Sequence, residues 1–112
     1  MIEQKPLTTG ASTLLAVLPG KGLVRACASG CAHVTYGPVT LDIRCQDAFR
    51  QFVETVGRHR GEAGEVHLRY YHATLRFSHE EFEEFASLIH NAWDEYLRLE
   101  VVKRLVSGVV EL

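Results

Sequence analysis

The chain has 112 residues, of which 46% are hydrophobic and 23% are charged, a composition typical of one globular domain with a modest core. The formal net charge is -2 and the isoelectric point is near 6.3, which disfavours nucleic acid as a partner. No apolar run is long enough to span a membrane, and the N-terminal residues lack the pattern of a secretory signal. We therefore expect a cytoplasmic protein with no membrane partner.

The N-terminal part is expected to hold a single hairpin. Residues 1–10 are expected to be a loose N-terminal segment. The pattern of residues 11–28 predicts a hairpin that turns between Pro19 and Gly22. The first strand of this hairpin carries apolar residues on both faces, which is typical of a covered strand.

Three cysteines lie around the next segment. An odd cysteine count in a chain without a secretory signal disfavours a disulfide framework, so we expect Cys27, Cys31 and Cys45 to be free thiols. A zinc site at Cys27, Cys31 and His33 is the alternative, with Asp42 and Cys45 in reserve, because thiolates and imidazoles are zinc ligands. A nucleophilic cysteine is a further alternative: Cys31 beside His33, or Cys45 just before a helix, whose dipole would favour a thiolate, although no oxyanion hole is evident.

Residues 32–57 predict a hairpin followed by a helix. The stretch AHVTYGPVTLDI alternates apolar and polar residues on both sides of a two-residue loop at Gly37 and Pro38. This register places His33 and Thr35 on a polar face, with Asp42 opposite His33.

The segment from Cys27 to Phe52 resembles a family of small uncharacterised bacterial proteins that have a cysteine pair before a short hairpin and a helix. The residues that carry the resemblance are Cys27, Cys31, Val34, Gly37, Val39, Leu41 and the Phe49/Phe52 pair. The similarity covers about a quarter of the chain. It implies the hairpin and the helix but no activity, because the family has none assigned.

A second unit of the same kind is predicted over residues 66–106, after a polar, glycine-rich connector at 58–65. Its hairpin sequence VHLRYYHATLRF aligns with AHVTYGPVTLDI without a gap, and a Phe-x-x-Phe helix follows each of them. The agreement indicates an internal duplication.

Both helices have recognisable ends. The first is expected at about 46–56, with Gly57 as its stop. The second begins at a capping box from Ser78 to Glu81 and is expected to reach about Val106, before Gly108.

These elements predict an α+β fold in a single domain, 1–112, with residues 107–112 as a tail. The domain would have two layers, an antiparallel sheet of about six strands and two helices on one face, built from a duplicated β-hairpin–helix unit.

Two surfaces are candidates for binding. The first is the polar sheet face with the second hairpin loop, which would hold a protein or a small anionic ligand unless it is simply solvated. Its residues are His33, Thr35, His67, Arg69 and Arg76, with Tyr71 and His72 at the loop. The second surface is a stripe on the long helix, which we expect to form a homodimer. Its residues are Trp93, Tyr96, Leu97 and Val101. The sequence thus favours a non-catalytic, homodimeric binding module without a cofactor, and a metal-binding or thiol-dependent protein is the alternative.

Overall fold

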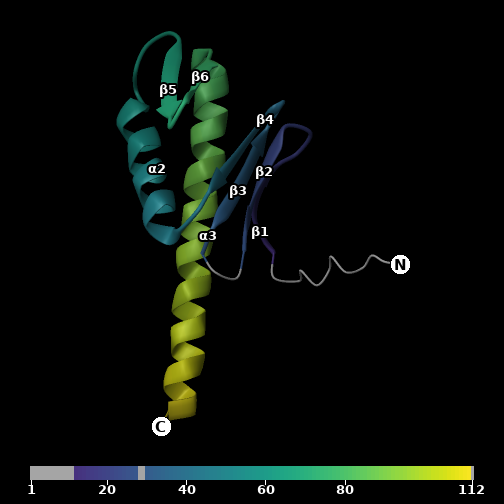
Figure 1. Ribbon diagram of the computed structural model, residues 1–112, viewed down its shortest axis with the longest axis vertical. Coiled ribbons are helices and arrows are strands. Elements are labelled where there is room, and N and C mark those ends of the chain that lie inside the picture. The colour runs from purple at the N-terminus through teal and green to yellow at the C-terminus, as the bar shows by residue number, and fades with distance from the viewer. Residues whose placement is uncertain (1–11, 28–29, 112) are drawn as a thin grey trace, which may run out of the picture.

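The part of the chain that the structure describes has an α+β fold of six strands and two helices (Figure 1). The computed structural model describes the backbone of residues 12–27 and 30–111 and the side chains as far as residue 105. In chain order the elements are β1 (Thr13–Leu18), β2 (Gly22–Ala26), β3 (Ala32–Tyr36), β4 (Val39–Ile43), α2 (Gln46–His59), β5 (Val66–Tyr70), β6 (Ala73–Phe77) and α3 (His79–Glu111).

The first four strands form an antiparallel sheet in the order β1-β2-β3-β4. The predicted register of the β3–β4 hairpin is confirmed, because Tyr36 pairs with Val39 across the loop and His33 pairs with Asp42. Alternation gives β3 and β4 one apolar and one polar face. The apolar face of the sheet carries the buried side chains of Val24, Ala26, Ala32, Val34, Leu41 and Ile43. The edge strand β1 is apolar on both faces, and Leu14 and Val17 are exposed on its outer face, so the expectation that this strand is covered is wrong.

The remaining strands, β5 and β6, form a separate two-stranded sheet. The expectation of one sheet of about six strands is therefore wrong. Alternation within a hairpin determines which face is buried, but it does not determine which hairpins pair with each other. The two sheets meet through side chains instead, for example where the Tyr70 hydroxyl donates to the backbone carbonyl of Asp42 at 3.3 Å.

The helix starts follow from local capping. The predicted capping box of α3 is confirmed, since the Glu81 N–H donates to Ser78 Oγ at 3.1 Å and the Ser78 N–H donates to Glu81 Oε1 at 2.9 Å. At α2, the Cys45 sulfur accepts from the N–H of Ala48 at 3.5 Å. Both helices run past their expected ends at Gly57 and Gly108. One glycine costs a helix only about 1 kcal/mol relative to alanine, and helical neighbours on both sides compensate for it.

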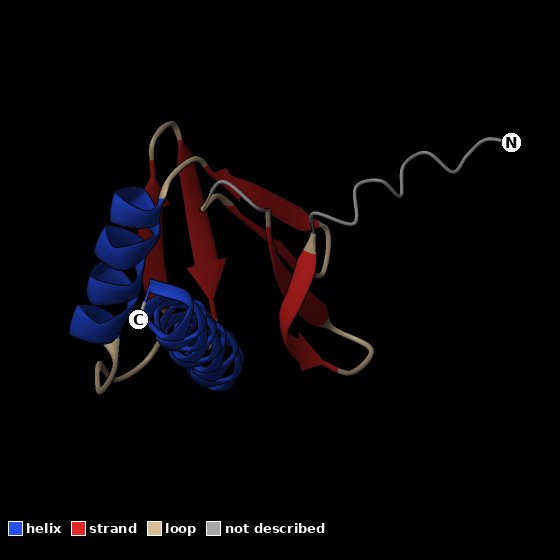
Figure 2. Ribbon diagram, turned by 90° about the horizontal axis from the view of Figure 1, so that it is seen from below, coloured by secondary structure: helices blue, strands red, loops and turns tan. Residues whose placement is uncertain are grey.

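The core lies where α3 meets α2 and the two sheets. Figure 2 looks nearly along α3 and shows α2 on one side of it and the four-stranded sheet on the other. The fully buried ring of Phe85 contacts an aromatic residue from each neighbour: Tyr36 of the larger sheet, Phe52 of α2 and Phe77 of the smaller sheet. This cluster replaces the simple two-layer packing expected from the sequence.

Candidate thiol site

Cys27 and Cys31 form a disulfide across the loop between β2 and β3. The expectation of three free thiols is therefore wrong for this pair and holds for Cys45. The chain folds back within the loop, because the N–H of Cys27 donates to the Cys31 carbonyl at 2.9 Å and Gly30 takes a φ of 96°. This turn brings the two Cα atoms to 5.3 Å, inside the range that a disulfide requires. Counting cysteines does not reveal such a local pair.

The loop rests on the helical layer. A Cβ atom added at Gly30 would lie 3.6 Å from the hydroxyl of Tyr96 on α3. Burial, and secondly the nearby Glu100 carboxylate, raise the pKa of the Tyr96 phenol, so its hydroxyl stays protonated beneath the loop at neutral pH. The buried Tyr96 side chain thus lies close to Gly30 of this loop instead of on an exposed face of α3.

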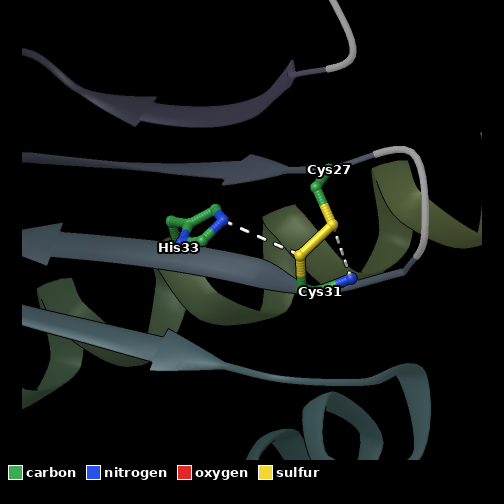
Figure 3. A group of neighbouring side chains, drawn as sticks. All are labelled: Cys27, Cys31 and His33. Carbon is green, nitrogen blue, oxygen red and sulfur yellow. Dashed lines mark hydrogen bonds between the residues drawn. A yellow bond between two sulfur atoms is a disulfide. The ribbon is translucent and has the colours of Figure 1, made fainter. Parts of the chain in front are cut away.

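His33 connects the disulfide to a carboxylate. Its Nε2 atom lies 3.7 Å from Cys31 Sγ (Figure 3), and its Nδ1 atom lies 2.8 Å from Asp42 Oδ1. A carboxylate accepts a hydrogen bond, so Asp42 favours the tautomer with the proton on Nδ1. The lone pair of Nε2 then points toward the Cys31 sulfur. A cysteine, a histidine and an orienting carboxylate in this order form the arrangement that activates a nucleophilic thiol.

The surroundings of the two sulfurs differ. Cys27 Sγ accepts a hydrogen bond from the backbone N–H of Cys31 at 3.1 Å, whereas Cys31 Sγ is the sulfur beside the imidazole (Figure 3). Arg25 on β2 is the cross-strand neighbour of His33, on the side opposite to Asp42. The guanidinium of Arg25 adds positive charge to the face where His33 lies, which favours negative charge on a nearby sulfur or on an approaching molecule.

The same residues could hold a metal ion. One potential ligand atom from each of Cys27, Cys31 and His33 lies within 4.8 Å of the others. Cys45, which the sequence analysis named as a further possible ligand, lies outside this group and caps α2.

The predicted polar face is divided between the two sheets. His33 and Thr35 lie on the four-stranded sheet, whereas His67, Arg69 and Arg76 lie on the two-stranded sheet. His67 pairs with Glu65 at 3.0 Å and has no cysteine beside it in the part of the chain that the structure describes.

The loop of the second hairpin adopts the conformation that its residues disfavour. Tyr71 has a φ of 54°, close to the 57° of Gly37 in the first hairpin, and its side chain is 70% exposed. Its ring lies edge-on to Tyr70, with the two centroids 4.6 Å apart. A groove of about 210 Å³ runs between this loop and α2, and Arg69 contributes to its lining. His72 lies beside Tyr71 in the loop and is exposed.

The predicted dimer stripe is only partly exposed. Trp93 and Tyr96 pack against Phe49 of α2, with ring centroids 5.0 and 5.7 Å apart, so they belong to the core or its edge. Leu97 and Val101 are exposed as predicted, at 40% and 52%. Among the side chains that the structure describes on this helix, those of Val102 and Leu105 are exposed as well.

Comparisons with known protein families, with curated proteins and with solved structures find no match to this chain. None of the helices in the described residues combines the length and the hydropathy that a membrane span requires.

Proposed function

We propose that the protein exchanges thiols and disulfides at the Cys27–Cys31 pair, with Cys31 as the attacking thiol. The observation that carries this proposal is the contact of His33 with both Cys31 and Asp42, at 3.7 and 2.8 Å. His33 is placed to take a proton from Cys31, and Cys27 is within bonding distance to complete the exchange. Both cysteines are partly exposed, so a substrate sulfur can approach.

The proposed reaction starts from the reduced protein. The Cys31 thiol gives its proton to Nε2 of His33, and the resulting thiolate attacks one sulfur of a substrate disulfide. A new S–S bond joins Cys31 to that sulfur, while the other substrate sulfur leaves as a thiolate and takes up a proton.

Cys27 completes the reaction. Its thiolate attacks the Cys31 sulfur, re-forms the Cys27–Cys31 disulfide and releases the remaining substrate sulfur, which is also protonated. The protein thereby gives two electrons to the substrate, and the reverse sequence oxidises a substrate dithiol. Arg25 favours substrates that carry negative charge.

The test is the rate at which oxidised glutathione converts the reduced protein to its disulfide form, followed by alkylation and mass spectrometry. Replacing Cys45 by serine first removes the third thiol and keeps a hydrogen-bond acceptor at the helix cap, with the serine oxygen in place of the sulfur. His33→Asn is expected to slow the reaction at least tenfold at pH 7, since general-base assistance is typically worth 10² to 10⁴.

His67→Asn is the matched control, because His67 also pairs with a carboxylate on a sheet surface. It should leave the rate unchanged. A His33→Asn protein that reacts as fast as the His67→Asn protein would overturn the proposed role of His33.

A second candidate function, the homodimeric interaction module, is favoured by the exposed part of α3. The helix extends well beyond the sheets toward its C-terminus (Figure 1). The exposed apolar side chains on this part are Leu97, Val101, Val102 and Leu105. Water-exposed apolar side chains at helical spacing are suited to contact another helix.

The charges beside these side chains suit an antiparallel copy of the same helix. Leu97 and Val101 are equally distant from position 99, and so are Asp94 and Arg104. In an antiparallel pair centred there, Leu97 would meet the partner's Val101, and Asp94 would meet the partner's Arg104. Neither charge has an ion-pair partner within the described side chains, whereas Glu95 pairs with Arg98 and Glu100 pairs with Lys103.

Light scattering of the full chain tests this candidate. Asp94→Arg and Arg104→Asp are each expected to weaken the dimer, because each places like charges opposite one another. The double variant should restore the dimer. A monomeric wild-type chain, or a double variant as weak as the single variants, would rule out this arrangement.

A further inference from the structure

We infer that the reduced form of this site binds a zinc ion through Cys27, Cys31 and His33. The inference rests on the proposed function only in that the Cys27–Cys31 pair must be reducible. The distance from Cys31 Sγ to His33 Nε2 is 3.7 Å. Zn–S and Zn–N bonds of about 2.3 and 2.0 Å at a tetrahedral angle give a ligand separation of roughly 3.5 Å. The distance between His33 Nε2 and Cys31 Sγ is therefore already close to the distance between two ligands of one zinc ion.

Cys27 can provide the third ligand. Once the S–S bond is reduced, its sulfur needs to move only to the separation of two thiolate ligands, roughly 3.8 Å for Zn–S bonds of about 2.3 Å. The two Cα atoms are 5.3 Å apart on the two sides of one short loop, so side-chain rotation can provide this movement. The spacing of three residues between Cys27 and Cys31 lies within the range found for pairs of zinc-binding cysteines.

Asp42 orients the imidazole of His33 for binding a metal ion as well as for accepting a proton. Its hydrogen bond to Nδ1 fixes the tautomer in which Nε2 has a free lone pair. Carboxylates in this position commonly orient metal-bound histidines and raise their basicity. Asp42, which orients His33 as the base in thiol exchange, would thus also hold His33 in place as a zinc ligand.

The donor set selects the kind of metal ion. Two thiolates and an imidazole suit zinc and exclude magnesium and calcium, which prefer oxygen ligands. Two thiolates also neutralise the charge of Zn²⁺. The three residues leave a fourth position for water or for a thiol from another molecule.

Zinc and thiol exchange would compete for the same sulfur atoms. When a disulfide oxidant accepts two electrons from the two zinc-bound thiolates, it becomes two thiolates itself. The Cys27–Cys31 bond forms at the same time and Zn²⁺ is released, because a disulfide sulfur is a poor zinc ligand. Bound zinc should therefore slow oxidation, and oxidation should release zinc.

The test is a titration of the reduced, metal-free full chain with zinc alone, in competition with a chromophoric chelator, in the Cys45→Ser background. We expect one zinc ion per chain, bound by the reduced protein and not by the oxidised protein. Cobalt should give the charge-transfer absorption of thiolate ligands, which identifies the cysteines directly. Cys27→Ser and His33→Asn should each abolish binding at equimolar zinc.

Two variants separate a metal site from loose thiol binding. Asp42→Asn is expected to weaken zinc binding 10- to 100-fold, as loss of an outer-shell partner does. His67→Asn should leave the affinity unchanged, and circular dichroism should show that all variants remain folded.

The outcomes also separate this inference from the proposed function. A reduced protein that exchanges disulfides but binds no zinc overturns the zinc site alone. A protein that binds zinc but does not react with disulfides overturns thiol exchange alone. Zinc affinity that is unchanged in His33→Asn would contradict the assignment of His33 as a ligand.

Discussion

Replacing Asp42 by asparagine tests whether the carboxylate activates Cys31 through His33. The oxygen of the asparagine amide can still accept a hydrogen bond from the Nδ1–H of His33. The amide has no negative charge, however, and so does not stabilise an imidazolium. The His33–Asp42 contact is 2.8 Å long, but the side chains are 45% and 69% exposed, so solvent screens their interaction. We therefore expect the change to cost about 1 kcal/mol of thiolate stabilisation, roughly a fivefold loss in rate.

The assay is alkylation of Cys31 by iodoacetamide at pH 7, in a chain whose other two cysteines are serine. Asp47→Asn is the control, because Asp47 is an exposed carboxylate that pairs with Arg50 on α2. Equal alkylation rates in the Asp42→Asn and Asp47→Asn chains would refute the role of Asp42.

Three further predictions concern the fold. Phe85→Ala should lower the free energy of unfolding, measured by urea denaturation, by about 3 to 5 kcal/mol, because the ring is fully buried between α2 and both sheets. A loss below about 1 kcal/mol would contradict this packing. Tyr71→Gly should raise the thermal midpoint, since a non-glycine residue at a φ of 54° is strained, and an unchanged or lower midpoint would show that the Tyr70 contact outweighs the strain. The hydrogen bond from Lys21 lowers the pKa of the Glu84 carboxyl, so this exposed pair stabilises the fold above the unfolded pKa of roughly 4.3 and the benefit disappears as the pH falls through the folded value. Urea titrations of the wild type and of Glu84→Gln should accordingly converge in acid, and a stability difference that persists at pH 2 would contradict the pairing.

The hairpin registers could be predicted from the sequence because alternation is a local property. The phase change at Gly37 and Pro38 correctly placed Asp42 opposite His33, and the same reasoning placed Tyr71 in the second loop. The capping box at Ser78 was also predictable, since it depends on residues three positions apart.

Long-range features were not predictable in the same way. Alternation does not specify which hairpins share a sheet, so the sequence does not reveal the division into two sheets. Helix periodicity places Trp93 and Tyr96 on the same stripe as Leu97, but it cannot show that α2 covers one side of this stripe. The disulfide depends on the turn at Gly30, which brings Cys27 and Cys31 together, and a count of cysteines contains no information on this turn.

The most direct test of thiol exchange is to trap its intermediate. Without Cys27, a mixed disulfide on Cys31 has no thiol to resolve it. Cys27→Ser in the Cys45→Ser background, exposed to oxidised glutathione and analysed by intact mass spectrometry, should accumulate one glutathione per chain at Cys31. The matching Cys31→Ser chain should react much more slowly, because it lacks the sulfur that lies 3.7 Å from Nε2 of His33. Equal trapping at the two cysteines, or no trapping at Cys31, would contradict the assignment of Cys31 as the attacking thiol.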